Sequence, residues 1–65
     1  WRLSVKPGDL IREYGYEYDP PGLLLKVEDR RKSEPYIILC ANGKILKFSK
    51  KYIETDCYVA SEARV

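Results

Sequence analysis

Residues 36–48 read Tyr-Ile-Ile-Leu-Cys-Ala-Asn-Gly-Lys-Ile-Leu-Lys-Phe, which is two apolar runs joined by Asn42 and Gly43. Asn-Gly between apolar runs is the strongest short signal for a β-hairpin, because a type I′ turn needs positive φ at both central residues. The pattern therefore predicts an antiparallel hairpin with a type I′ turn at Asn42 and Gly43. A hairpin alone is only marginally stable in water, so further strands must cover it.

Three more strands are predicted from alternating apolar residues. Residues 10–14 follow a turn at residues 6–9, where Pro presets φ and Gly supplies positive φ. In residues 23–28, Leu23, Leu25 and Val27 are predicted to point inward and Leu24 outward. Residues 53–59 form the last strand, with Ile53 and Cys57 on one face. The first arm of the hairpin is apolar on both faces, which predicts an interior position.

The connections differ in length and chemistry. Residues 14–22 form a long loop because Pro20, Pro21 and Gly22 do not continue a central strand. Residues 29–34 form a charged loop, and residues 49–52 suit a single 3₁₀ turn. Five short strands connected in this order predict an all-β fold, a five-stranded SH3-like small barrel with a 3₁₀ turn before the last strand.

The composition indicates a folded domain. The chain has 65 residues, of which 45% are hydrophobic and 34% charged. We expect one domain over residues 1–65, with an N-terminal arm at 1–5 and a C-terminal tail at 60–65. No apolar run approaches the roughly 20 residues of a membrane span. The first residues lack the apolar core of a secretory signal, so we expect neither membrane insertion nor signal-directed secretion.

Catalysis and metal binding are disfavoured by the residue types present. The chain has no His and only two Cys, which removes the commonest general base and leaves too few ligands for a zinc site. Each Cys lies in an apolar pattern, so a buried thiol is favoured over a disulfide. Asp9 and Glu13 are interpreted as turn and surface residues. We therefore expect no enzymatic activity, no metal and no cofactor.

Three segments carry a resemblance to a known group of proteins. They are Lys-Pro-Gly-Asp-Leu-Ile-Arg at 6–12, Gly-Leu-Leu-Leu at 22–25 and Tyr-Ile-Ile-Leu-Cys-Ala-Asn-Gly-Lys at 36–44. With a closing apolar residue at Ile53, they resemble short SH3-like proteins of tailed phages, including cyanophages. The resemblance implies an SH3-like fold and a viral origin, with the chain in the virion or in the cytoplasm of an infected host. Cys40 and Lys47 depart from it, because aromatic residues are usual there.

Two other families are more weakly similar. Residues 14–19, Tyr-Gly-Tyr-Glu-Tyr-Asp, resemble the acidic, tyrosine-rich loop of eukaryotic SH3 domains, and residues 51–53 resemble their helical turn. The paired Trp of the proline-binding groove is missing. The Gly-Asp-Leu opening is similar to KOW modules, which implies loops that contact RNA or proteins.

Aromatic residues and prolines favour a protein partner as the first functional hypothesis. Tyr and Trp provide large contact areas at low entropic cost and are enriched at interfaces. The alternative is that these tyrosines plug the end of the barrel. The candidate protein-binding residues are Tyr16, Tyr18, Pro20, Pro21, Tyr52 and Trp1.

A basic segment supports a second hypothesis, DNA or RNA binding. Residues 30–53 carry seven basic side chains and one acidic side chain, and basic surfaces with nearby aromatics bind nucleic acids. The alternative is that lysines keep the strand edges soluble. The candidate nucleic-acid-binding residues are Arg30, Arg31, Lys32, Lys44, Lys47, Lys50 and Lys51.

Overall fold

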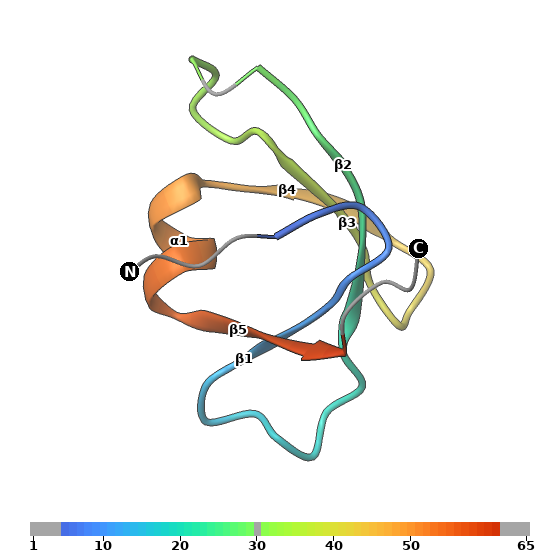
Figure 1. Ribbon diagram of the computed structural model, residues 1–65. Coiled ribbons are helices and arrows are strands. Elements are labelled where there is room, and N and C mark those ends of the chain that lie inside the picture. The colour runs from blue at the N-terminus through green and yellow to red at the C-terminus, as the bar shows by residue number, and fades with distance from the viewer. Residues whose placement is uncertain (1–4, 30, 62–65) are drawn as a thin grey trace.

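Five antiparallel strands form one sheet in the computed structural model, which describes residues 5–29 and 31–61 (Figure 1). The sheet order is β4-β3-β2-β1-β5. The predicted all-β architecture with five strands is confirmed. The strands are β1 (Leu10–Glu13), β2 (Gly22–Val27), β3 (Tyr36–Leu39), β4 (Ile45–Phe48) and β5 (Cys57–Ser61), and a short helix, α1 (Lys50–Thr55), lies between β4 and β5.

The predicted hairpin is present as β3 and β4, but its turn is not type I′. Cys40 N–H donates to the Lys44 carbonyl at 2.8 Å, so three residues separate the paired positions. Gly43 has φ +86°, whereas no residue other than glycine has positive φ in the described part of the chain. Asn42 instead accepts the Lys44 N–H through Oδ1 at 3.0 Å. The extra loop residue leaves only Gly43 in the left-handed region, as in three-residue hairpin loops.

The predicted facing of β2 is wrong for Leu24 and Leu25 and right for Lys26 and Val27, because the strand contains a β-bulge. Leu24 pairs with Ile38 and Lys26 pairs with Ile37, so Leu25 is the extra residue. Leu24 is 1% exposed and Leu25 is 39% exposed, the reverse of the alternation that we predicted. A bulge places two residues of one strand opposite one of its partner and so resets which side chains point inward.

The segment before the last strand is an α-helix rather than the predicted 3₁₀ turn. Ser49 caps α1 by accepting the Tyr52 N–H at 3.2 Å. The predicted strand at residues 53–59 is therefore wrong in its first half, because Ile53 belongs to α1 and β5 begins at Cys57. Ile53 and Cys57 are four residues apart, a spacing that fits both one helical turn and two strand repeats. β5 includes Ala60 and Ser61, which we assigned to the tail.

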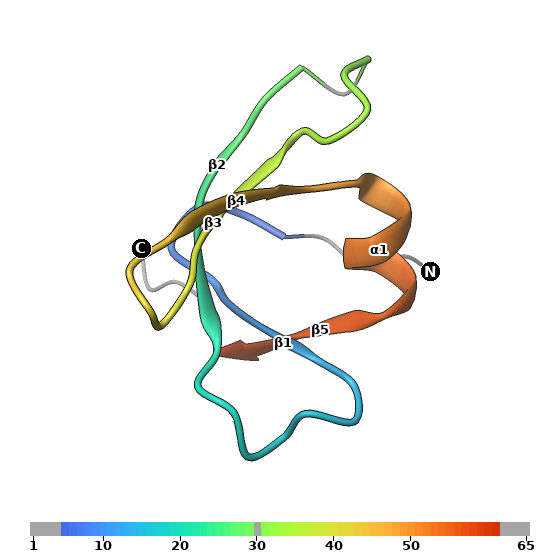
Figure 2. The same cartoon turned by 180° about the vertical axis from the view of Figure 1, so that it is seen from behind.

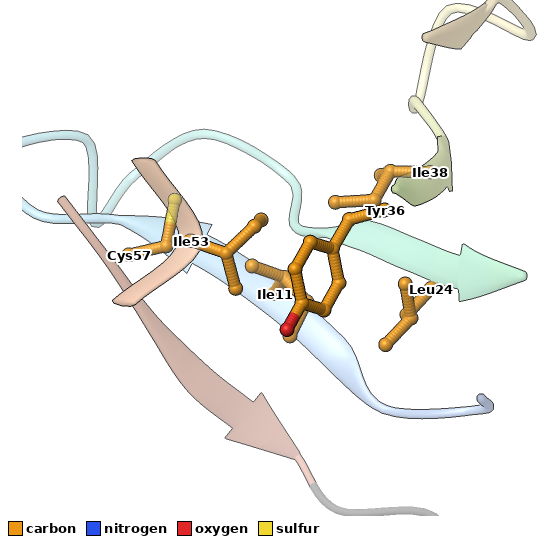
Figure 3. Packing of buried hydrophobic residues seen from close by; sticks show 6 residues of the cluster. All are labelled: Ile11, Leu24, Tyr36, Ile38, Ile53 and Cys57. Atoms are coloured by element: carbon orange, nitrogen blue, oxygen red, sulfur yellow. The ribbon is translucent and has the colours of Figure 1, made fainter. Parts of the chain in front are cut away.

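The core lies between the sheet and α1. Its buried side chains come from every strand except β4, and Figure 3 shows them packed together: Ile11, Leu24, Tyr36, Ile38, Ile53 and Cys57. Val5, which we assigned to an N-terminal arm, packs against this cluster. Both Cys40 and Cys57 are free thiols, and the predicted burial is complete for Cys57 and partial for Cys40.

The turn before β1 is held by a buried carboxylate. The Asp9 N–H donates to the Lys6 carbonyl at 3.1 Å, and Gly8 has φ +96°. Asp9 is 0% exposed, so its interpretation as a surface residue is wrong. Its carboxylate accepts the Lys6 N–H at 2.9 Å and the Lys6 ammonium at 3.2 Å. These charge-assisted bonds compensate for burying the charge and hold β1 at its entry into the sheet.

Candidate functional site

The loop between β1 and β2, residues 14–21, is a series of turns rather than an extended segment. Tyr16 N–H donates to the Glu13 carbonyl at 3.1 Å, and Asp19 N–H donates to the Tyr16 carbonyl at 3.1 Å. These bonds fold the loop back beside β1. Figures 1 and 2 show this loop and the loop that includes residues 28–29 and 31–35 at opposite ends of the molecule.

The loop presents its tyrosines to solvent. Tyr16 is 55% exposed and Tyr18 is 103% exposed. Tyr14 is 60% exposed, and its ring lies 4.7 Å from that of Tyr58 on β5. In the described structure these rings therefore do not plug the end of the sheet, which was the alternative to a binding role.

A groove lies between this loop and β1. It has a volume of about 410 Å³. Two of the predicted residues, Tyr16 and Pro20, line the groove, whereas Tyr18 and Pro21 do not. Its lining residues are Ile11, Arg12, Glu13, Tyr16, Asp19 and Pro20.

The groove places an arginine close to two acidic residues. One basic residue, Arg12, and two acidic residues, Glu13 and Asp19, are among those that line it. Arg12 Nε is buried and has no hydrogen-bond partner within the described residues. A buried donor without an acceptor costs free energy.

Tyr52 does not line the groove but contacts Glu13, a residue that does. Its ring stacks on Phe48 with the centroids 5.0 Å apart. Its hydroxyl donates to Glu13 Oε1 at 2.9 Å. Burial, followed by this hydrogen bond, raises the pKa of Tyr52. Tyr52, a predicted protein-binding residue, therefore contacts a groove residue without lining the groove itself.

Cys57 on β5 pairs with Glu13 on β1. Burial raises the pKa of its thiol; a hydrogen bond with Tyr52 opposes this shift, and the charges of Glu13 and Asp56 add to it. A thiol with a raised pKa holds less thiolate at neutral pH and is a weaker nucleophile. This environment suits a packing role for Cys57.

The predicted basic residues are spread over several elements, and some of them form ion pairs. Arg31 and Lys32 lie in the 28–35 loop and pair with Asp29 at 2.7 Å and Glu28 at 3.4 Å. The Arg31 side chain, through its hydrogen bonds, lowers the pKa of Asp29. These pairs neutralise much of the basic charge at this end of the molecule.

Three lysines outside that loop keep their charge free of ion pairs. Lys50 in α1 lies 3.9 Å from Glu54. Lys44, Lys47 and Lys51 make no ion pair among residues 5–29 and 31–61. Lys44 and Lys47 belong to the β3–β4 hairpin, where Lys47 pairs with Ile37. Trp1 and Arg30, the two remaining predicted site residues, lie outside the described residues.

Sequence reasoning missed four of the groove residues. Ile11, Arg12 and Glu13 were interpreted only as strand or surface residues, and Asp19 only as part of the loop. The available signal was the position of Arg12 and Glu13 at the end of a strand that leads directly into a tyrosine-rich loop. Only the backward fold of the loop brings them together.

In the part of the chain that the structure describes, His, Cys, Asp and Glu side chains form no group of three that would hold a metal ion. Among these same residues, α1 is the one helix and falls well short of a membrane span. No protein-family model, curated protein or solved structure matches the chain.

Proposed function

We propose that this chain is a non-enzymatic protein-interaction module with an SH3-like barrel fold, and that it binds its partner in the groove beside residues 14–21. The observation that carries the proposal is the groove itself, with Tyr16 and Pro20 on its wall. Five short antiparallel strands, a long first loop and a helical turn before the last strand support the barrel.

The chemistry of the groove favours a polypeptide. Tyr16, Pro20 and Ile11 offer apolar contacts, while Glu13 and Asp19 accept hydrogen bonds from a partner's amides or basic side chains. Such a mixture suits a chain that alternates apolar and polar groups.

The same groove disfavours a nucleic acid. Carboxylates at Glu13 and Asp19 repel phosphates, and most of the predicted basic residues lie elsewhere or in ion pairs. Nucleic-acid binding through Lys44, Lys47 and Lys51 is therefore an outcome that the experiment must test. The resemblance to tailed-phage proteins makes a virion protein or a host protein the partner that we propose.

The test is capture of the partner by immobilised full-length chain, from host lysate and from disrupted virions, with nuclease present. We expect Tyr16→Ser and Pro20→Ala each to reduce the captured partner about tenfold, because each removes an apolar contact from the groove wall. Arg31→Ala is the matched control, because Arg31 lies in the loop at the other end of the molecule.

Two results contradict the proposal. One is a captured protein that binds the Tyr16 and Pro20 variants as well as the original chain. The other is capture of nuclease-sensitive species alone, accompanied by DNA or RNA binding that weakens when Lys44 and Lys47 are replaced by Glu. Strong salt dependence of that binding would identify phosphate contacts.

A further inference from the structure

Within the described residues, β4 is an edge strand of the sheet. The Cys40 N–H bonds to the Lys44 carbonyl at 2.8 Å, which makes residues 40 and 44 a hydrogen-bonded pair. Hydrogen-bonded pairs alternate along an antiparallel ladder, so Leu46 and Phe48 direct their backbone groups toward β3. The N–H and C=O groups of Ile45 and Lys47 therefore point to the open edge.

Apolar side chains are exposed on both faces of this edge. Ile45 is 60% exposed and Leu46 is 45% exposed. Leu46 pairs with the buried Ile38 and so lies on the core face, whereas Ile45 pairs with Leu39 on the outer face. A strand added beside β4 would cover apolar surface on both faces and satisfy the free backbone groups.

The charge along this edge is of one sign. Residues 35–53 contain four Lys and no Asp or Glu. Lys44 and Lys47 flank the exposed apolar pair and make no ion pair within the described residues. Opposite charges across neighbouring strands stabilise the pairing, and like charges oppose it. Carboxylates are therefore the complement of this edge.

A second copy of the chain does not provide that complement. Antiparallel self-pairing centred on Leu46 would place Ile45 opposite the second copy's Lys47. The lysines of both copies would then lie along the interface between the two β4 strands, where no acidic side chain would face them. Lysines on an edge oppose such self-association, yet they leave the edge open to a strand of opposite charge.

We propose that β4 binds an extended acidic segment of a partner protein as an added antiparallel strand. Carboxylates of that segment lie opposite Lys44 and Lys47, and two apolar residues lie opposite Ile45 and Leu46. This surface is separate from the groove, because β3 and β2 lie between β4 and β1 in the sheet. The two proposals therefore succeed or fail independently.

The probe is a blocked peptide, acetyl-Thr-Glu-Val-Val-Glu-Thr-amide, added at millimolar concentration to the ¹⁵N-labelled full chain. We expect amide shifts centred on Ile45 and Lys47 and slower hydrogen exchange at these two amides. Leu46 and Phe48 should change less, because their amides already face β3. Amides of residues 14–21 should not move.

Two N-methylated isomers of the peptide test the backbone pairing. In the antiparallel register, the second Val lies opposite Ile45 and directs its N–H toward β4, whereas the first Val directs its N–H away. We expect methylation of the second Val to abolish binding and methylation of the first to preserve it. Equal binding of the two isomers, or the reverse preference, overturns the proposal.

Two further comparisons test the charge. Lys47→Glu should weaken the peptide about tenfold, because it replaces cross-strand attraction by repulsion. Lys26→Glu makes the same charge change on β2 and should leave affinity within about twofold, since solvent ions screen it. A peptide with Lys in place of both Glu should not bind.

The proposal is overturned if the acidic peptide does not bind, or if its shifts centre on residues 14–21. It is also overturned if the chain alone self-associates in sedimentation with protection at Ile45 and Lys47. That result would assign the edge to a second copy.

Discussion

Replacing Leu24 and Leu25 separately by Ala tests the bulge in β2, because the two neighbours have the same side chain and opposite environments. Leu24 is 1% exposed and packs in the core, whereas Leu25 is 39% exposed. Leu-to-Ala changes in a core cost about 2–5 kcal/mol, through lost burial and the cavity left behind. We expect about 3 kcal/mol for Leu24→Ala and less than about 1 kcal/mol for Leu25→Ala.

The difference is large for a chain of this size. A 65-residue domain has a free energy of unfolding of about 3–10 kcal/mol. The Leu24 change therefore removes a third or more of it and lowers Tm by about 12–24 °C, at about 4–8 °C per kcal/mol. Urea and thermal unfolding followed by circular dichroism measure both variants.

Losses of equal size, or a larger loss for Leu25→Ala, would refute the bulge. A larger loss for Leu25→Ala would instead indicate the regular alternation, in which Leu23, Leu25 and Val27 face the core. Hydrogen exchange of the amides that pair β2 with β3 gives a second measure of the register.

Two further predictions concern Tyr52 and the glycines. Burial and then the Glu13 hydrogen bond raise the pKa of Tyr52 above its ordinary value of about 10, so the folded chain keeps a proton that the unfolded chain loses. The free energy of unfolding should therefore fall as pH rises above about 10. Tyr52→Phe should make that fall shallower and should cost about 1 kcal/mol at neutral pH. If the substitution leaves the unfolding curves across this pH range unchanged, the raised pKa of Tyr52 is contradicted. A Cβ at Gly22 would lie 2.5 Å from Ile38 Cγ2, whereas one at Gly43 meets nothing within 4 Å. We expect Gly22→Ala to cost about 1–3 kcal/mol, because the added methyl group crowds Ile38. Gly43→Ala should cost about 1–2 kcal/mol, because Gly43 has positive φ. Only Gly22→Ala should shift the NMR signals of the Ile38 methyl groups.

The candidate site was partly predictable. Tyr16 and Pro20 were identified from the aromatic and proline content of the loop, and both line the groove. Tyr52, in the stretch that resembles the helical turn of SH3 domains, was predicted to bind a protein partner, yet its hydroxyl donates to Glu13. Contacts across 39 residues of chain, as between Tyr52 and Glu13, leave no local signal in the sequence.

The basic segment is a second case in which contacts could not be predicted from the sequence. Charge along the chain indicated one basic segment, but the sequence does not show which of its residues form ion pairs. Arg31 and Lys32 pair with acidic neighbours within their own loop, while Lys47 lies on the edge strand and Lys44 immediately before it. Only the sheet order determines which lysines face an open edge.

The sequence by itself determined the hairpin, the turn at residues 6–9 and the all-β class, because turn residues and apolar alternation act over a few neighbours. The tertiary structure decided the facing of Leu24, the burial of Asp9 and the helix at Ile53. In each case a local pattern had two solutions, and packing against distant residues selected one. The bulge, for example, directs Leu24 and Val27 toward the core beside Ile38 and Tyr36, so the regular alternation of β2 yields to the filling of the core.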